Sequence, residues 1–399
     1  MQHTPNANRL HIAIFGRRNV GKSSLINALT GQNIALVSNV AGTTTDPVYK
    51  AMELLPIGPV VIIDTAGIDD KGSIGELRVK KTKEVISKTD VAIIVFSSEE
   101  SFDPIEKEWF TRLKEAEIPV IGVVNKIDLK NPEIDTYKSK FDIPFVKTCT
   151  NDPSSLENLK KLLFKSIPFY EKETILGDLI QSGDVVVLVA PQNIQAPKGR
   201  LILPQVQTIR DILDHKGLAL TVTDDKLEET LSKIKNPPDL VVTDSQVFEK
   251  VNQILPDDVS LTSFSILMSR YKGELDIFIA GAYAIDGLKD NDKVLIAEAC
   301  THHPLQGDIG REKLPNWLKT YTGKRIKTVT KAGVDFDDDL SQYKLIIHCG
   351  ACMFNRKQMM SRILQAKNQN TPITNYGIAI AHMNGILPKV TKMYPEIQD

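Results

Sequence analysis

The chain has few cysteines, almost no net charge and no long apolar run, and each of these excludes a class of protein. Only four of its 399 residues are cysteine, and 49 basic side chains are nearly balanced by 50 acidic ones. So few cysteines argue against a disulfide framework in a reducing compartment, and the charge balance argues against a broad basic face for nucleic acid or membrane. No apolar run is long enough to span a membrane, and the polar residues 1–6 do not resemble a signal peptide. We expect a soluble, cytoplasmic protein that contacts neither membrane nor nucleic acid.

The first motif present is a phosphate-binding loop. Residues 16–23 fit the pattern G-x-x-x-x-G-K-[ST], between an apolar strand expected at 12–15 and a helix expected at 24–29, ended by Gly31. Such a loop closes backbone N–H groups around phosphate oxygens, and the following helix adds positive potential. We expect Lys22 to meet the terminal phosphates and the Ser23 hydroxyl to bind Mg²⁺. The motif predicts nucleotide binding.

Motifs after further apolar strands identify the nucleotide as GTP. Asp64, after the run 60–63, places a carboxylate near Mg²⁺, and Gly67 stands where a γ-phosphate can be sensed. Asp128 can accept two hydrogen bonds from guanine, from an edge that adenine lacks. Asn125 and the stem of Lys126 complete the base pocket in this interpretation. The backbone at Thr148 and Cys149 is expected to offer an N–H to the guanine oxygen. The full set expected to bind GTP is Gly16, Asn19, Val20, Gly21, Lys22, Ser23, Ser24, Asn125, Lys126, Asp128, Thr148 and Cys149.

In order and spacing, these motifs resemble the translation-factor-like GTPases, closest to the tRNA-modification and ribosome-assembly branch. The resemblance covers residues 10 to about 165, and it makes loop 41–46 the first switch, with Thr44 the expected Mg²⁺ contact. Ile68 stands where Ras-like enzymes carry the glutamine that orients the attacking water. In the resembling branch an asparagine helps to hold a catalytic K⁺ ion, and Asn19 occupies that place. The resemblance implies slow intrinsic hydrolysis that K⁺ accelerates; Arg17 and Arg18 are alternative charge donors, both expected to face solvent.

The remainder of the chain predicts two more α/β domains. We expect strands at 185–190, 218–223, 240–243 and 259–264, separated by helices at 205–214, 226–234 and 247–254. A third block has expected strands at 275–280, 294–299, 326–329 and 345–347, and a helix at 356–367. Alternation of this kind is typical of parallel sheets with crossover helices. The fold class is therefore α/β, with three domains that each contain a mostly parallel sheet, at residues 1–170, 175–264 and 265–399. The middle domain has no catalytic set and is assigned to self-association.

A second site is expected in the last block, which holds three of the four cysteines. Cys300 is followed by His302, and Cys349 and Cys352 form a C-x-x-C pair preceded by His348. Both segments follow expected strands, where open parallel sheets place their ligands, and Cys352 stands before a helix whose N-terminus favours a thiolate. A redox pair or buried apolar cysteines remain alternatives. Metal binding is favoured, and the residues alone leave zinc and a [4Fe–4S] cluster nearly equal.

The combined pattern resembles a known family. C-x-H, some forty-five residues, then H-C-x-x-C, joined to an N-terminal GTPase, is similar over the whole chain to the [FeFe]-hydrogenase maturation GTPases. The resemblance implies a [4Fe–4S] cluster held by Cys300, Cys349 and Cys352, in a homodimer that carries the diiron subcluster precursor. It also implies two radical S-adenosylmethionine maturases and the apo-hydrogenase as partners.

The fourth iron ligand is open at this stage. Alternation along a strand puts Glu298, Cys300 and His302 on one face, so Glu298 or His302 can reach the cluster. An exchangeable Glu298 is slightly preferred, and His348 is expected to point away. Two other classes remain: a tRNA-modification or ribosome-assembly GTPase with a structural zinc domain, and a non-catalytic redox sensor that couples a C-x-x-C pair to nucleotide binding.

Overall fold

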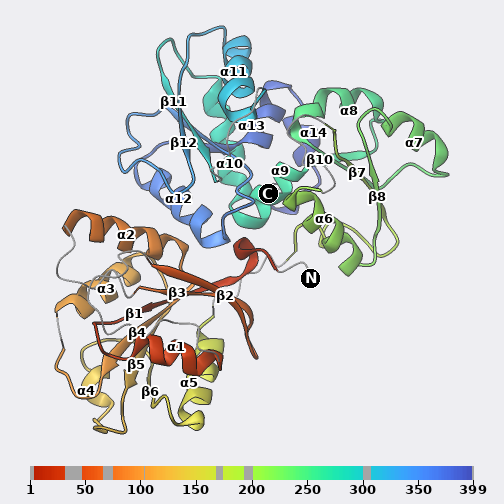
Figure 1. Cartoon of the computed structure of the whole chain (residues 1–399). Coiled ribbons are helices and arrows are strands. Elements are labelled where there is room, and N and C mark those ends of the chain that lie inside the picture. Colours follow the sequence, from red (N-terminus) through yellow and green to blue (C-terminus); the bar gives the residue numbers. More distant parts are fainter. Residues whose placement is uncertain are drawn as a thin grey trace. The chain divides into compact units, whose positions relative to one another are not determined.

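The computed structural model describes residues 4–31, 47–65, 75–102, 104–167, 174–192, 201–299 and 307–397. The chain divides into two compact units, Met1–Tyr170 and Glu171–Asp399, which Figure 1 colours from red to yellow and from green to blue. Each unit is described by itself below. Within the described residues, no helix combines the length and the apolar composition that crossing a membrane requires.

The first unit is a mixed sheet with helices on both faces (Figure 1). Its strand order is β2-β3-β1-β4-β5-β6, and only the β2–β3 pair is antiparallel. The strands are β1 Leu10–Phe15, β2 Val48–Leu54, β3 Gly58–Asp64, β4 Val91–Ser97, β5 Val120–Asn125 and β6 Phe145–Lys147. The helices are α1 Lys22–Thr30, α2 Gly75–Lys88, α3 Pro104–Glu115, α4 Asp135–Lys138 and α5 Pro153–Ser166, and a short 3₁₀ turn, η1 Asn6–Asn8, precedes β1.

The two faces of this sheet carry separate hydrophobic cores, as alternation along β1 shows. Ala13 and Phe15 face the core made with α2, α3 and α4, whereas Ile12 and Ile14 face the core made with α1 and α5. A strand buried on both faces reads as a continuous apolar run, which is why the central strands were recognisable from sequence. The parallel strands direct their carboxyl ends to one edge, and the nucleotide motifs follow those ends.

The second unit contains two fully parallel four-stranded sheets. The first has the order β10-β9-β7-β8 and the second the order β12-β11-β13-β14. The strands are β7 Val185–Val189, β8 Leu218–Val222, β9 Leu240–Thr243, β10 Ser260–Ser263, β11 Lys293–Glu298, β12 Lys327–Ala332, β13 Leu345–His348 and β14 Ile373–Asn375. The helices are α6 Leu203–Asp214, α7 Leu227–Lys233, α8 Phe248–Ile254, α9 Phe264–Lys272, α10 Leu275–Ala282, α11 Leu314–Thr322, α12 Arg356–Asn368, α13 Tyr376–Met383 and α14 Leu387–Thr391. Short turns of other helix types are η2 Ser245–Val247, η3 Tyr283–Ile285, the π-helical η4 Ile309–Lys313 and η5 Pro395–Ile397.

The two sheets of this unit share one hydrophobic core, which runs from Ile175 to Tyr394. Polar contacts also link the first sheet and α9 to the C-terminal part of the chain. The hydroxyl groups of Thr262 on β10 and of Tyr394 after α14 are 2.6 Å apart, and the Ser265 hydroxyl at the start of α9 donates to Asn375 Oδ1 at the end of β14 (3.1 Å). The element that follows β10, α9, therefore lies between the sheets and contacts α6, α12 and α13.

One predicted strand is wrong. Residues 275–280 belong to helix α10, not to a strand. Leu275, Phe278 and Ala282 are buried at helical spacing, but a short apolar run cannot be assigned by periodicity alone. The packing decides here, because Gly281 lies against the backbone of Ile373 so closely that an added Cβ would stand 1.9 Å from the Ile373 carbonyl oxygen.

Candidate functional site: the phosphate loop

The phosphate loop lies between β1 and α1, as the motif predicts. Gly21 has φ 92° and precedes the first helical residue, Lys22. Lys22 is 5 % exposed, and its ammonium donates to the carbonyl oxygens of Gly16 and Arg17, the latter at 3.0 Å. The Lys22 side chain therefore folds back onto the loop whose backbone N–H groups are expected to bind phosphate oxygens. Asn19 is exposed in the left-handed region at φ 65°.

Arg17 does not face solvent as expected, and this expectation is wrong. Its guanidinium donates from Nε to Glu106 Oε1 (2.9 Å) and from Nη2 to the Ser101 carbonyl oxygen (2.7 Å). Nη2 also lies 3.1 Å from Glu100 Oε2. Because Glu106 on α3 is fully buried, an unpaired carboxylate there would be costly. Arg17 therefore links the phosphate loop to α3 through a long-range contact that no local sequence pattern predicts.

Candidate functional site: the guanine pocket

Asn125, the last residue of β5, links the phosphate loop to the loop at Thr148 and Cys149, which is expected to contact guanine. It is 2 % exposed. Its Nδ2 donates to the Val20 carbonyl oxygen (3.0 Å), and its Oδ1 accepts from the Thr148 hydroxyl (3.1 Å). A Cβ added at Gly21 would lie 2.4 Å from the same Nδ2. Asn125 thus holds two loops of the nucleotide site together.

The other predicted base-pocket residues surround this link. Lys126 follows with φ 62°, and its ammonium lies 3.8 Å from Glu99 Oε2. Asp128 is exposed in the turn after β5, available to a base. The Thr148 N–H donates to the Val124 carbonyl oxygen (2.8 Å) and the Cys149 N–H to the Ser155 hydroxyl (3.1 Å). A guanine oxygen would have to displace Ser155 to reach the Cys149 N–H.

Two parts of the predicted site lie outside the described residues, namely the first switch with Thr44 and the segment with Gly67 and Ile68. Asp64, the last residue of β3, is described and is 8 % exposed. It lies at the same edge of the sheet as the phosphate loop, since β1 and β3 run parallel with Ile14 opposite Asp64.

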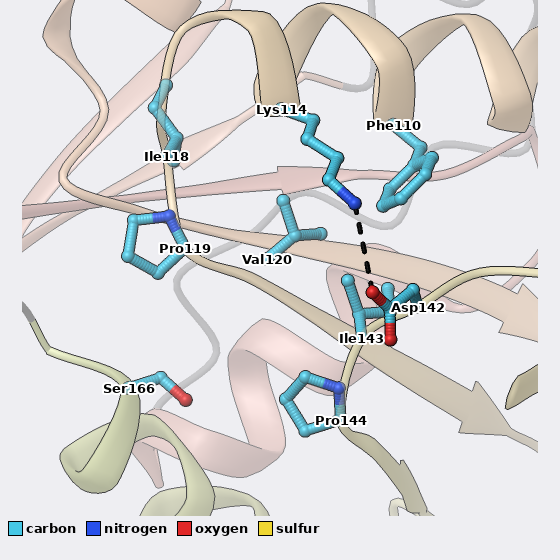
Figure 2. A pocket seen from close by; sticks show the side chains of 9 residues that line it. All are labelled: Phe110, Lys114, Ile118, Pro119, Val120, Asp142, Ile143, Pro144 and Ser166. Atoms are coloured by element: carbon cyan, nitrogen blue, oxygen red, sulfur yellow. Dashed lines mark ion pairs between the residues drawn. The ribbon is translucent and has the colours of Figure 1, made fainter.

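A separate pocket of about 310 Å³ opens at the opposite edge of this sheet (Figure 2). Val120, the first residue of β5, lies at its base, and Phe110 and Ile118 line it together with Pro144. The one ion pair drawn, Lys114 Nζ to Asp142 Oδ2 at 3.9 Å, is exposed on both sides. None of the lining residues belongs to the nucleotide motifs, which follow the carboxyl ends of the strands.

Candidate functional site: the cysteine edge

The second predicted site lies at the carboxyl ends of β11 and β13. These strands are adjacent and parallel, with Ala297 opposite His348. The Cys349 N–H donates to the Ala297 carbonyl oxygen (2.8 Å), and the Ala299 N–H donates to Cys349 Sγ (3.1 Å). The backbone directly before Cys300 is therefore bonded to the Cys349 sulfur. Cys300, His302 and His303 lie outside the described residues.

Cys352 lies in the turn between β13 and α12. The cysteines that the structure describes are half-buried and form no disulfide. Burial raises the pKa of the Cys352 thiol, and the charge of Lys272 together with the backbone N–H groups of Cys352 and Met353 opposes this. The helix α12 begins only at Arg356, with Asn355 as its N-cap, so the bonds to sulfur come from the turn itself.

Two buried cations, Lys272 and Arg362, interact electrostatically with these thiols. Burial lowers the pKa of Lys272 to about 8, and Cys352 and Cys349 oppose that shift. Burial likewise lowers the pKa of Arg362 to about 10, opposed first by Cys349. The Arg362 guanidinium lies 4.5 Å and 4.6 Å from the ring centroids of Phe336 and Phe354. N–H groups directed at the sulfurs and nearby positive charges stabilise thiolates more than they stabilise neutral thiols.

His348 is fully buried, and both of its ring nitrogens have partners. Nδ1 lies 2.8 Å from the Cys349 carbonyl oxygen and Nε2 lies 2.8 Å from Arg362 Nη1. Burial, and then the charge of Arg362, lowers the pKa of His348 to about 3. A neutral ring that donates from Nδ1 and accepts at Nε2 satisfies both contacts.

Glu298 is the last residue of β11 and is 3 % exposed. Its Oε2 lies 3.5 Å from Arg311 Nη2. An added Cβ at Gly310 would approach Glu298 Oε1 to 2.7 Å, so η4 packs closely on this carboxylate. Among the described residues no group of three or more histidine, cysteine, aspartate or glutamate side chains could hold a metal ion.

The described part of this edge nevertheless fits a cluster ligated by cysteine. Two thiols, N–H donors to both sulfurs and two buried cations converge, and hydrogen bonds to sulfur are among the means by which proteins tune iron–sulfur centres.

Comparison with known proteins

Three family models match the chain. A model described as 50S ribosome-binding GTPase matches residues 11–126, the hydrogen maturase F dimerization domain matches residues 175–273, and the hydrogen maturase F tetramerization domain matches residues 276–393. The boundary between the last two falls between α9 and α10, after Lys272.

Among curated proteins, similarity is confined to part of each relative. The chain is 33 % identical over 161 residues to the tRNA modification GTPase MnmE of Chromobacterium violaceum, a match that covers 40 % of this chain and 35 % of the relative. It is 31 % identical over 213 residues to GTPase Der of Helicobacter hepaticus, covering 51 % of this chain and 44 % of the relative. The chain thus spans less than half the length of these relatives.

Solved structures also match only a part of the chain. An Era variant from Aquifex aeolicus bound to GDP and AlF₄⁻ matches 56 % of this chain and 97 % of its own, with 22 % identity and a TM-score of 0.36. The G domain of the FeoB iron transporter of T. maritima matches 40 % of this chain and 99 % of its own, with 25 % identity and a TM-score of 0.32. Scores of this size add nothing to the family models.

The first unit is therefore a GTPase domain, and the two sheets of the second unit correspond to two oligomerization domains. The order of the three, together with the two motif sets that they carry, is the architecture of one family. The chain belongs to the hydrogen maturase F family.

Proposed function

We propose that this protein is a GTP-hydrolysing scaffold that holds a [4Fe–4S] cluster through Cys300, Cys349 and Cys352. On it, the diiron subcluster precursor would be assembled and then delivered to apo [FeFe]-hydrogenase. The observation that carries the proposal is the 3.1 Å bond from the Ala299 N–H to Cys349 Sγ, because it brings the chain next to Cys300 to the C-x-x-C pair. When bound, a three-thiolate cluster supplies one iron with an exchangeable fourth position.

The fourth ligand is proposed to be Glu298 or His302, with Glu298 preferred. Glu298 ends the strand that leads to Cys300 and is positioned by Arg311. Pulsed EPR of the Glu298→Ala cluster is expected to show altered ligation, and an unchanged spectrum would remove this preference.

GTP turnover is proposed to depend on K⁺ held by Asn19, with Mg²⁺ bound by Ser23 and Thr44 and with Lys22, Asp64 and Gly67 acting on the phosphates. Exposure of Asn19 at a positive φ within the loop is compatible with an ion contact. Hydrolysis is expected to be faster in KCl than in NaCl at equal ionic strength, and the Asn19→Ala variant should lose the difference. Equal rates in both salts would contradict the proposal.

The nucleotide is proposed to act as a switch rather than to drive cluster chemistry, because the phosphate loop and the cysteines belong to different units. Affinity for the two radical S-adenosylmethionine maturases, or for the hydrogenase, is expected to differ between the GTP and GDP forms. Immobilised protein loaded with a GTP analogue or GDP would measure this, and identical affinities would contradict it.

The oligomerization domains assign self-association to this chain, and we propose β8 with α6 as a dimer surface. β8 is an edge strand, and edge strands readily pair with another chain. Leu213 on α6 is 53 % exposed and Leu218 on β8 is 57 % exposed. Leu218→Lys is expected to lower the mass measured by light scattering, whereas an unchanged mass would exclude this surface.

The test of the whole proposal is anaerobic purification with metal analysis and an absorption spectrum. A brown, iron-rich protein supports it. A colourless, zinc-rich protein would favour a structural zinc domain, and a metal-free protein would favour a redox pair; either result contradicts the scaffold. A cytoplasmic location is part of the proposal, since partner maturation is proposed to take place there.

A further inference from the structure

Lys272, the last residue of α9, is one of the largest fully buried side chains of the molecule, at 1 % exposure. Its ammonium donates to three carbonyl oxygens of the turn after β13, those of Ala351 (3.2 Å), Cys352 (3.1 Å) and Phe354 (2.7 Å). Burying an ammonium costs several kcal/mol unless charge and hydrogen bonds compensate it. The hydrogen bonds are supplied by the turn, and the charges that favour the ammonium form of this lysine are those of Cys352 and Cys349 as thiolates.

These contacts determine which way the turn presents its peptide groups. The Ala351 and Cys352 carbonyls point at the ammonium, so the N–H groups of the same two trans peptide groups, those of Cys352 and Met353, point the opposite way. These N–H groups act to lower the pKa of the Cys352 thiol. The φ of Ala351 is 51°, in the left-handed region that L-residues rarely adopt. A single cation therefore holds together a turn whose backbone would otherwise be unfavourable.

The contact is reciprocal. Arg356, the first residue of α12, donates from Nη1 to the carbonyl oxygens of Tyr271 and Gly273, both at 3.1 Å. Its Nη2 donates to Glu274 Oε1 (3.0 Å). The segment 271–274 and the segment 351–356 thus bind each other's backbone. The first of these segments is where the dimerization model ends and the tetramerization model is about to begin.

We propose that Lys272 is the positioning residue of the cysteine edge, holding the turn so that Cys349 and Cys352 face one ligand and supplying a positive charge against a net-negative thiolate cluster. The inference rests on the proposed function, because it presumes that these thiols hold iron. It differs from a role in folding alone, since the charge acts on the bound cluster as well as on the turn.

The experiment compares full-length wild type, Lys272→Met and Lys272→Gln after anaerobic reconstitution with iron and sulfide. Lys250→Met is the control, an exposed lysine on α8 of the same unit that pairs with Asp224 at 2.7 Å and lies away from the cysteines in the sequence. The readouts are the rate of iron loss to a chelator and the midpoint potential of the cluster, with circular dichroism of each apoprotein as the folding check. Loss of a positioning partner outside the ligand set typically weakens metal binding about 10–100-fold.

We expect both Lys272 variants to release iron about tenfold faster or more and to have a more negative potential, because the reduced cluster loses a neighbouring positive charge. Lys250→Met should match wild type. Folded variants with wild-type release and potential overturn the inference while leaving the proposed function intact. The Lys272→Gln side chain keeps an N–H donor. If the apoproteins of both Lys272→Met and Lys272→Gln are unfolded by circular dichroism, Lys272 is required for folding and its assignment as a positioning residue is wrong. A wild type that binds no iron contradicts the proposed function itself.

Discussion

Replacing Asn125 by alanine tests whether this side chain supports the nucleotide site or only contacts the base. The Nδ2 bond to Val20 and the Oδ1 bond from Thr148 are both buried. Alanine leaves the Val20 carbonyl and the Thr148 hydroxyl without these partners. Each buried group left in this way costs about 1–3 kcal/mol, so the free energy of unfolding of the first unit should fall by about 2–6 kcal/mol, even without nucleotide.

Urea unfolding followed by tryptophan fluorescence measures this loss. The chain has two tryptophans, and a Trp317→Phe background leaves Trp109, which is 1 % exposed in the first unit, as the reporter. Asn131→Ala is the control, because it removes an exposed bond from Lys147 (2.7 Å) and should cost less than about 0.5 kcal/mol. If Asn125→Ala weakens GTP binding but leaves the unfolding of the nucleotide-free protein unchanged, the two-loop link is not the role of Asn125.

Three more results follow from buried groups. Burial lowers the pKa of His11 to about 4, so as the pH falls His11 becomes protonated in the unfolded chain before it does in the folded one. The contribution of His11 to the free energy of unfolding of the first unit should therefore be complete above about pH 6.5 and fall by up to about 3 kcal/mol toward pH 4. His11→Phe should remove this pH dependence from the free energies measured by urea unfolding. Gly281→Ala should destabilise the second unit by about 1–3 kcal/mol through overpacking, seen by calorimetry, whereas Gly287→Ala, whose added Cβ would have its nearest neighbour at 3.7 Å, should not. Arg17→Gln should lower the unfolding free energy of the first unit by about 1.5–3 kcal/mol, as expected for a charged hydrogen bond, and the exposed Arg18→Gln should have little effect.

The sequence predicts most of the regular secondary structure of this protein. Central strands such as β4 and β7 are apolar on both faces, and α1 is bounded by the loop glycine and by Gly31, so both leave a local signal. β2 leaves none, because it is a mostly exposed edge strand with an irregular pattern, and β14 is three residues long. α10 was misassigned because its apolar run suits either element until Gly281 meets Ile373.

Within the sites, residue types and spacing were predictable but partners were not. The motifs select Lys22 and Asn125 from the sequence, yet the bond from Asn125 to Val20 spans 105 residues and is set by the fold of the sheet. Arg17 with Glu106, and Lys272 with the turn at 351–354, are likewise long-range pairs. Charged side chains of this kind look like ordinary surface residues in a sequence, and only burial reveals them.

The central claim is that the cysteine edge of this GTPase holds iron and sulfide. Its most direct test is the iron and acid-labile sulfide content, with EPR of the reduced sample, of full-length protein reconstituted without oxygen, beside Cys300→Ala, Cys349→Ala and Cys352→Ala. The account predicts iron and sulfide in the ratio of a [4Fe–4S] cluster in wild type and loss of that cluster in each variant. Wild-type protein without a cluster, or variants that keep the same EPR spectrum, would contradict it.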